Sequence, residues 1–587
     1  MINRIKYFLC FVWIPFLLQA QVINQIEIVD NVSFSDDEIL SWMEIERGTR
    51  FYEGILDTIN SQISHNLSLR GYFNPEFRGS MIEVSTDSQK VNLLVSVFEG
   101  EATQIKKIFV SGNDSLLVER SLEELDYLKG QIFNKYEIEQ SINYILLNLE
   151  NEAYPFSAIT ITSLHFYHDS INGNNYVDLY LKLEPGIRSS IDKIEVRGNE
   201  STKDYVVIRE LRLEEGEEYS QERIDNLPKK LNRLRFFEPV SKPQFYIDSE
   251  NKGVLLIELK ERQTNNFDGI IGYQPAATGE ETGFVTGLVN VSLRNLFGTG
   301  RAAAFRWRKI NRNSQELEIK YLEPWLFSFP LNISLSFYQR QQDTIYVQRT
   351  FSAEVEYLAT EEVSAGVFIT SESTIPTLTD PPVFTVYNSS NITTGVNFKF
   401  DTRDDPLAPK GGIFFLNSYK FSKKSITGPD EFITEDTETD LTLQRFEATL
   451  ALYFELFRNQ VLAFSISGKE LRGSSFEISD LFRLGGTNSL RGYREDQFLG
   501  NRVFWTNFEY RFFLTPRTYA FLFFDTGYFL QSANELQGLQ KLEDFKTGYG
   551  LGLNLETAIG VLGVSFALAE GDSFSDGKIH FGIVNEF

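Results

Sequence analysis

Histidine is the side chain that most often performs acid–base or metal chemistry near neutral pH, and the chain has four: His65, His165, His168 and His580. His165 and His168 lie on a predicted strand, where a spacing of three places them on opposite faces, so they cannot share a metal ion. No Gly-x-Ser-x-Gly elbow, phosphate-binding loop or zinc motif is present, and the carboxylates form no recognisable acid–base pair. We therefore predict no catalytic residue, no metal site and no cofactor.

An arginine in a glycine-rich segment is the other chemically distinctive feature. Residues 482–486 read Phe-Arg-Leu-Gly-Gly, and Leu490, Arg491, Gly492 and Tyr493 follow shortly after. The segment lies between strand-like stretches, which predicts a loop. A guanidinium is always charged and can form paired hydrogen bonds to a carboxylate. On composition alone such an arginine is most often solvated surface, so its role depends on the elements around it.

The first twenty residues are typical of a secretory signal peptide. Arg4 and Lys6 precede the apolar residues 7–18, and Leu18-Gln19-Ala20 provides a cleavage site. The only cysteine, Cys10, lies in this leader, so we expect a mature chain without disulfides or thiolate sites. The net charge of −25 and the lack of any Lys/Arg-rich run exclude a nucleic-acid partner.

The N-terminal part of the chain repeats itself. Similar short strands end in asparagine at residues 26–31, 108–113 and 194–199, at spacings of 82 and 86 residues. Each is followed by a helical stretch, which the glycines Gly48, Gly130 and Gly216 are expected to cap. A second amphipathic helix and two alternating strands complete each copy, as with Ile55, Ile59, Ile63 and Leu67 in the first. The pattern predicts three small α+β domains of the order β-α-α-β-β.

After about residue 263 the helical period gives way to alternation of two. Phe504, Phe508 and Phe512 alternate with polar residues such as Glu509, and aromatic residues reach 14% of the chain. Aromatic, period-2 strands are typical of a transmembrane barrel, and 324 residues accommodate about 16 strands at roughly 20 residues each. The alternative for such strands, a large soluble β-sandwich, fits the leader and the apolar outer faces poorly.

We therefore predict a fold class of α+β periplasmic repeats followed by a 16-stranded antiparallel transmembrane β-barrel. The expected boundaries are a signal peptide at 1–20, repeats at 21–101, 102–187 and 188–263, and the barrel at 264–587. Phe581 and the terminal Phe587 resemble the aromatic signal in the last strand of bacterial outer-membrane proteins.

Residues 490–493 resemble the Arg-Gly-aromatic motif in the sixth extracellular loop of the BamA/TamA family of outer-membrane protein assembly factors. The three repeats are similar to the family's polypeptide-transport-associated (POTRA) domains. Asp401, Arg403 and Asp404 resemble its Asp-x-Arg-Asp strand end, and residues 295–300 its early Asn-x-x-Gly-x-Gly turn. The resemblance covers essentially the whole mature chain.

In that family the loop folds into the barrel lumen, where its arginine pairs with acidic residues on the wall. The matching positions here are Glu509 and Asp525. The polar parity of its strand independently places Glu509 in the lumen. The alternative is that both carboxylates face only water in the lumen.

The resemblance implies a factor in the Gram-negative outer membrane, with its repeats in the periplasm, that helps to fold and insert β-barrel proteins. The expected partners are unfolded outer-membrane or exported client proteins, membrane lipids and accessory lipoproteins. A dedicated secretion pore of the two-partner type is the first alternative, and a passive porin or receptor is the second. The sequence leaves open whether this is an essential general factor or an accessory paralogue.

Overall fold

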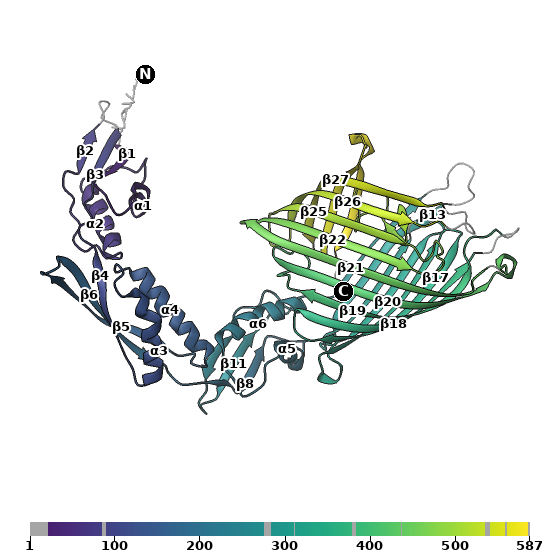
Figure 1. The fold of residues 1–587 in the computed structure, drawn as a ribbon, viewed down its shortest axis with the longest axis horizontal. Coiled ribbons are helices and arrows are strands. Elements are labelled where there is room, and N and C mark those ends of the chain that lie inside the picture. Colours follow the sequence, from purple (N-terminus) through teal and green to yellow (C-terminus); the bar gives the residue numbers. More distant parts are fainter. Residues whose placement is uncertain are drawn as a thin grey trace, which may run out of the picture. The chain divides into compact units, whose positions relative to one another are not determined.

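The computed structural model describes residues 21–84, 90–274, 283–309, 311–377, 383–435, 437–533, 540–557 and 560–584 (Figure 1). The predicted signal peptide and Phe587 lie outside these ranges. The chain forms two compact units. The first holds residues up to Asp192 with 216–223 and 247–253, and the second holds the rest of the third repeat together with the barrel.

The three predicted repeats share one fold. In each, the last strand lies in the middle of a three-stranded sheet and runs parallel to the first, as β1 with β3, β4 with β6 and β8 with β11. The elements of the first are β1 (Val22–Val29), α1 (Asp36–Ser41), α2 (Ile55–Ser68), β2 (Met81–Val84) and β3 (Lys90–Ser96). The second has β4 (Thr103–Ser111), α3 (Ser115–Leu125), α4 (Lys135–Asn151), β5 (Ala158–Asp169) and β6 (Asn174–Glu184). The third has β8 (Lys193–Arg197), α5 (Asp204–Leu211), α6 (Gln221–Leu234), β10 (Gln244–Ile247) and β11 (Gly253–Glu258).

Helix packing in the first repeat follows the predicted apolar stripe. Ile55, Ile59, Ile63 and Leu67 on α2 are fully buried, at 0% exposure each. A capping box fixes the start of α1: the Ser35 hydroxyl accepts the backbone N–H of Glu38, and the Glu38 carboxylate accepts the backbone N–H of Ser35. Burial of one helix face against the sheet therefore forms the core of this small domain.

Gly48 and Gly216 are not helix caps, contrary to expectation, whereas Gly130 directly follows the 3₁₀ turn Asp126–Leu128 and its C-cap Lys129, as expected. Helix α1 ends at Ser41 and α5 at Leu211, well before Gly48 and Gly216. All three glycines have positive φ and donate their N–H to a carbonyl on or beside the first strand: Gly48 to Ile23, Gly130 to Ile105 and Gly216 to Ile191, at 2.7–2.8 Å. The repeated signal thus marks a turn that returns to the sheet. The third of these contacts involves a short pair of strands, β7 (Ser190–Ile191) and β9 (Glu217–Glu218).

The C-terminal part is one sheet of 16 strands in which sequence neighbours pair antiparallel, as predicted. Its strands are β12 (Asn266–Gln274), β13 (Phe284–Leu296), β14 (Arg301–Lys309), β15 (Gln315–Glu323), β16 (Leu331–Gln342), β17 (Tyr346–Leu358), β18 (Val363–Pro376), β19 (Asn388–Asp401), β20 (Gly412–Gly428), β21 (Asp440–Phe457), β22 (Gln460–Arg472), β25 (Arg502–Phe513), β26 (Tyr519–Gln531), β27 (Leu542–Thr557), β28 (Gly560–Ala569) and β29 (Lys578–Val584).

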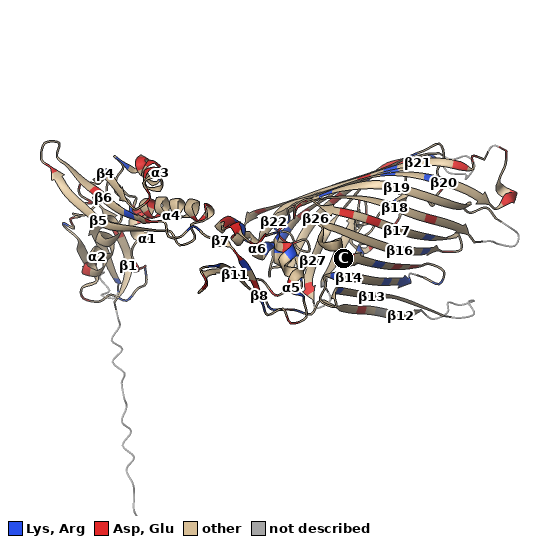
Figure 2. Cartoon of the chain, turned by 90° about the horizontal axis from the view of Figure 1, so that it is seen from below, with Lys and Arg blue, Asp and Glu red and all other residues tan. Residues whose placement is uncertain are grey.

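Exposure along the strands gives the two faces of this barrel. Phe504, Phe508 and Phe512 on β25 are exposed, whereas the side chain of Glu509 is only 14% exposed. Figure 2 shows basic and acidic residues interspersed along the repeats and the strands, with no long basic stripe. An apolar outer face and a polar inner face are what a membrane-spanning barrel requires. Among the described residues, no helix is long and apolar enough to cross a membrane.

Candidate functional site

The glycine-rich loop between β22 and β25 is packed inside the barrel. Two short strands, β23 (Phe482–Leu484) and β24 (Phe498–Gly500), pair at its base, and residues 485–497 form its tip. Leu490 and Tyr493 of the tip are buried against Val503 and Phe529 of the barrel wall. Burial of these apolar side chains favours one seated position for the loop over a solvated one.

The guanidinium of Arg491 lies between the two predicted carboxylates. Its Nη1 donates to Glu509 at 2.6 Å, while its Nε and Nη2 donate to the two oxygens of Asp525 at 2.8 and 2.7 Å. The backbone N–H of Arg491 also donates to Asp525, at 3.1 Å. The Phe523 ring lies under the guanidinium, with its centroid 3.8 Å from Cζ. The structure thus brings together residues from the loop, β25 and β26.

Burial makes this pairing energetically significant. Asp525 is 0% exposed and Arg491 is 6% exposed. A charge removed from water in this way is tolerated only when it is paired and hydrogen-bonded, because its desolvation is so costly. Glu509 has a second cation, Arg511, whose Nε lies 2.8 Å from its other oxygen. Arg491 therefore acts as a buried tether between the loop tip and two adjacent strands.

Close backbone approach is the second requirement of the seated loop. Gly492 has φ +94°, and a Cβ there would lie 2.8 Å from the carbonyl oxygen of Leu568 on β28. A Cβ on Gly548 of β27 would overlap the carbonyl oxygen of Arg491. Glycine at both positions lets loop and wall touch without a side chain between them.

His580, Thr547 and Asn507 complete the site, and the sequence analysis assigned none of them a role in it. His580 on β29 accepts a hydrogen bond at Nε2 from the Gly492 N–H, at 3.1 Å, and the Tyr493 hydroxyl donates to the Thr547 carbonyl at 2.9 Å. Asn507 donates to the Ser489 carbonyl at 2.7 Å. The alternation of their strands predicts that His580 and Asn507 face the lumen, but it does not predict which groups they contact.

The entry limb of the loop has its own buried charge cluster. Lys424 on β20 donates to Glu477 at 2.5 Å and to Asp480 at 2.7 Å, and all three side chains are at most 3% exposed. Glu477 also accepts the Tyr387 N–H at 2.7 Å, which joins the β18–β19 loop to the cluster. The loop is therefore held to the wall before its tip begins.

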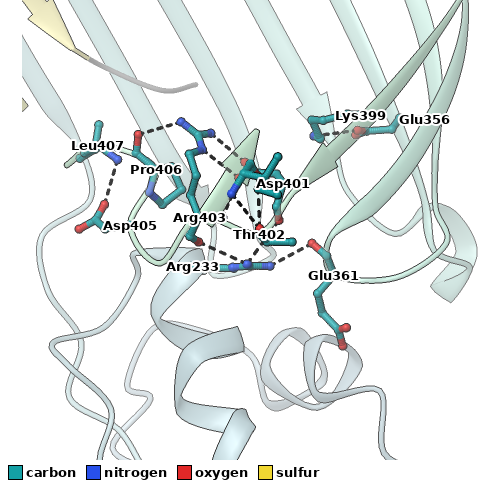
Figure 3. A network of polar contacts seen from close by, with 11 residues as sticks. Arg233, Glu356, Glu361, Lys399, Asp401, Thr402, Arg403, Asp405, Pro406 and Leu407 are labelled. Atoms are coloured by element: carbon teal, nitrogen blue, oxygen red, sulfur yellow. Dashed lines mark hydrogen bonds and ion pairs between the residues drawn. The ribbon is translucent and has the colours of Figure 1, made fainter. Parts of the chain in front are cut away.

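The Asp-x-Arg-Asp segment forms the turn after β19. Arg403 donates to both oxygens of Asp401, at 2.8 and 2.7 Å, and to the Pro406 carbonyl at 3.1 Å (Figure 3). Asp404 accepts the N–H groups of Lys410 and Gly411, at 3.0 and 3.2 Å. These bonds close the turn on itself and leave its outward carbonyls in fixed positions.

Arginines of the third repeat donate to the carbonyls of the barrel turns. Arg233 on α6 donates to the carbonyls of Glu361 at 3.0 Å, Arg403 at 3.4 Å and Asp401 at 3.5 Å (Figure 3). Arg212 donates to the carbonyls of residues 358–360 at 2.9–3.3 Å. The third repeat and the barrel are therefore joined through backbone groups.

Electrostatics at this junction favour the charged form of Glu361. Burial alone would raise the pKa of Glu361, but Lys230, 2.5 Å away, holds it below its usual value. The early turn contributes as well, because Asn295 donates to the hydroxyl of Thr202 at 2.7 Å. The third repeat and the barrel of this unit are thus joined by side-chain contacts as well.

Of the two aromatic residues singled out for the last strand, the structure describes Phe581. Phe581 is 67% exposed on the outer side, while His580 points inward. Phe587 lies beyond the described residues. Within the described ranges, no group of three or more His, Cys, Asp or Glu side chains is arranged to hold a metal ion.

Comparison with known families fits this architecture. The profile of the Omp85 superfamily domain matches residues 295–587, and that of the surface antigen variable number repeat, POTRA, matches residues 21–100 and 189–262. The chain belongs to the Omp85 superfamily. Its barrel lies in the outer membrane and its POTRA repeats in the periplasm.

Relatives of this Omp85 protein include outer membrane protein assembly factors named BamA. That of Neisseria meningitidis serogroup B is 23% identical over 59% of this chain and 42% of its own length. That of Nitratidesulfovibrio vulgaris is 24% identical over 95% of this chain and 70% of its own length. The crystal structure of Haemophilus ducreyi BamA lacking POTRA domains 1–3 covers 81% of this chain and 98% of its own, at 16% identity and a TM-score of 0.50. This chain therefore spans less than half of the first relative.

Proposed function

We propose that this Omp85 protein is an assembly factor that binds client segments through its periplasmic repeats and assists the folding and insertion of β-barrel proteins. The supporting observation is the union, in one chain, of POTRA repeats with a barrel whose lumen holds the Arg491 loop through Glu509 and Asp525. No catalytic step is assigned. The relatives named as assembly factors support the same reading.

Client binding would use the outer strands of the repeat sheets. β2 lies at the edge of its sheet, and Met81, Ile82 and Val84 on it are 42–53% exposed. β5 is also an outer strand, and its Ile161 and Phe166 are 40% and 45% exposed. An edge strand with free hydrogen-bonding groups can pair with an extended client segment by β-augmentation.

Insertion would then be driven without nucleotide. An unpaired backbone group in hydrocarbon costs several kcal/mol, so a client strand gains free energy as it pairs and enters lipid. The barrel would supply the site of pairing next to its first and last strands, β12 and β29. Clients, membrane lipids and accessory lipoproteins are the proposed partners.

Depletion of the protein followed by outer-membrane proteomics tests this function. A broad fall in barrel proteins supports an assembly factor, and its breadth separates a general factor from an accessory one. Loss of one exported protein would indicate a dedicated secretion pore instead. Unchanged protein levels with altered solute uptake would indicate a porin.

Photo-crosslinking tests the client-binding surface. A crosslinking amino acid at Ile82 on the β2 edge should capture barrel clients as they pass through the periplasm. The control position is Val32, which is 84% exposed but lies outside the strands. Equal capture at both positions would argue against β-augmentation at this edge.

A further inference from the structure

The distal part of the loop tip carries a second charged contact, on another wall of the barrel. Asp496 accepts a hydrogen bond from Nη2 of Arg340 on β16, at 2.7 Å. The Arg340 side chain is 13% exposed, and its Nε lies 3.5 Å from Glu316 on β15. Arg483, at the base of the loop, lies 3.7 Å from the same Asp496 oxygen.

The backbone at Asp496 is adapted to this contact. Its φ is +57°, in the left-handed region that L residues other than Asn and Asp rarely adopt. Its N–H donates to the Gly485 carbonyl at 3.4 Å. The loop therefore holds Asp496 in a backbone conformation that few residue types tolerate. From that position its carboxylate forms the ion pair with Arg340.

The two anchors of the loop lie on opposite sides of the lumen. In the order of the sheet, six strands, β17 to β22, separate β16 from β25. Arg491 binds β25 and β26, and Asp496 binds β16, so only the four residues 492–495 separate the two contacts along the chain. The loop thus reaches across the barrel interior rather than along one wall.

We propose that Asp496 and Arg340 are positioning residues that make the loop a cross-brace, fixing the spacing between the N-terminal strands and the C-terminal strands of the barrel. Arg491 holds one end and Asp496 the other. This role requires no client, so it can fail or hold independently of the proposed assembly function.

The charges on the β14–β16 wall explain why Asp496 matters. Arg308 and Arg340 both approach Glu316, at 2.9 and 3.5 Å, so two guanidinium groups share one carboxylate there. Asp496 supplies a second negative charge. Asp496→Asn keeps the shape and the tolerance for positive φ but removes this charge, so the brace should detach at that end.

The test measures the spacing directly. Spin labels at Asn313→Cys, in the β14–β15 turn, and Ser575→Cys, in the β28–β29 turn, report the distance between the two walls by electron–electron resonance. Cys10→Ser removes the chain's only native cysteine. The full chain is reconstituted in lipid nanodiscs, and its folding is scored by heat-modifiable migration in electrophoresis.

The braced barrel should give one narrow distance distribution. Asp496→Asn and Arg340→Gln should each broaden it, and the double variant should be no broader than either single one, because both remove the same contact. Glu543→Gln is the matched control, since its ion pair with Lys541 lies on a 46%-exposed carboxylate, and it should change nothing.

Two outcomes would overturn the proposal. A folded Asp496→Asn barrel with the narrow distribution of the parent would show that the contact does not set the spacing. A barrel that no longer folds would also contradict it, because that substitution leaves both the Arg491 anchor and the strand pairing intact.

Discussion

Substitutions at Arg491 and Asp525 can separate two effects. One is the free-energy cost of leaving a buried charge unpaired, and the other is the role of the loop in client assembly. In the part of the chain that the structure describes, all three hydrogen bonds to the Asp525 carboxylate come from Arg491. Arg491→Met keeps much of the side-chain volume but leaves Asp525 buried without its cation. Adding Asp525→Asn to that variant removes the stranded charge. The double variant should therefore be more stable than the single one.

The magnitude follows from burial and pairing. Breaking a buried ion pair by removing one partner costs ~3–5 kcal/mol, because the remaining charge stays desolvated. The second substitution should recover roughly 1–3 kcal/mol, the penalty for a buried polar group without its partner. Glu509 changes this little, since Arg511 still holds it at 2.8 Å in both variants.

Urea unfolding of the refolded barrel, followed by its heat-modifiable band, measures both changes. Arg502→Met, at the start of β25, is the control, because the ion pair of Arg502 with Glu470 is exposed and should contribute no more than ~1 kcal/mol. Client assembly should remain impaired in the double variant despite its recovered stability, since the tether is still absent. A double variant less stable than Arg491→Met would refute the electrostatic account of the site.

Two further substitutions probe how the loop is seated. Lys424→Met should lower barrel stability by ~3–5 kcal/mol and open residues 473–481 to external protease, because Glu477 loses its buried cation and Asp480 keeps only Arg445, at 3.5 Å. Protection equal to the parent would contradict this. Gly548→Ala should displace the loop tip and raise its protease sensitivity, because the new methyl overlaps the carbonyl of the loop arginine. Gly468→Ala, whose methyl would meet only a Phe ring atom at 3.7 Å, is its control and should leave the loop protected.

Much of the fold could be predicted because it depends on local periodicity. The stripe from Ile55 to Leu67 identified α2, and the alternation from Phe504 to Phe512 gave the two faces of β25. Two of the three repeat glycines, Gly48 and Gly216, were recognised but misread. A glycine at a position that needs positive φ looks the same in the sequence whether it caps a helix or forms a turn. Only the contact of Gly48 with Ile23 distinguishes the two cases.

The candidate site was less accessible to sequence reasoning, because its contacts cross long stretches of chain. Strand parity placed Glu509 inside the barrel, and family resemblance suggested Asp525. Nothing in the sequence indicated that the ring of Phe523 would lie beneath the guanidinium, or that His580 would accept the Gly492 N–H. These contacts depend on the curvature of the sheet, and the two-residue alternation along a strand carries no information about that curvature.

The buried charge clusters also bear on whether a solute can pass freely through the lumen. To leave it, the loop must break the Arg491 pairs and release the limb held by Lys424. Release separates the charges of both buried clusters, and each charge must regain its hydration as water enters the lumen. A barrel braced in this way would rarely open by thermal fluctuation alone, which is unfavourable for a passive porin. Opening would instead require a partner that binds the released state more tightly, as an incoming client strand or a dedicated exported protein could.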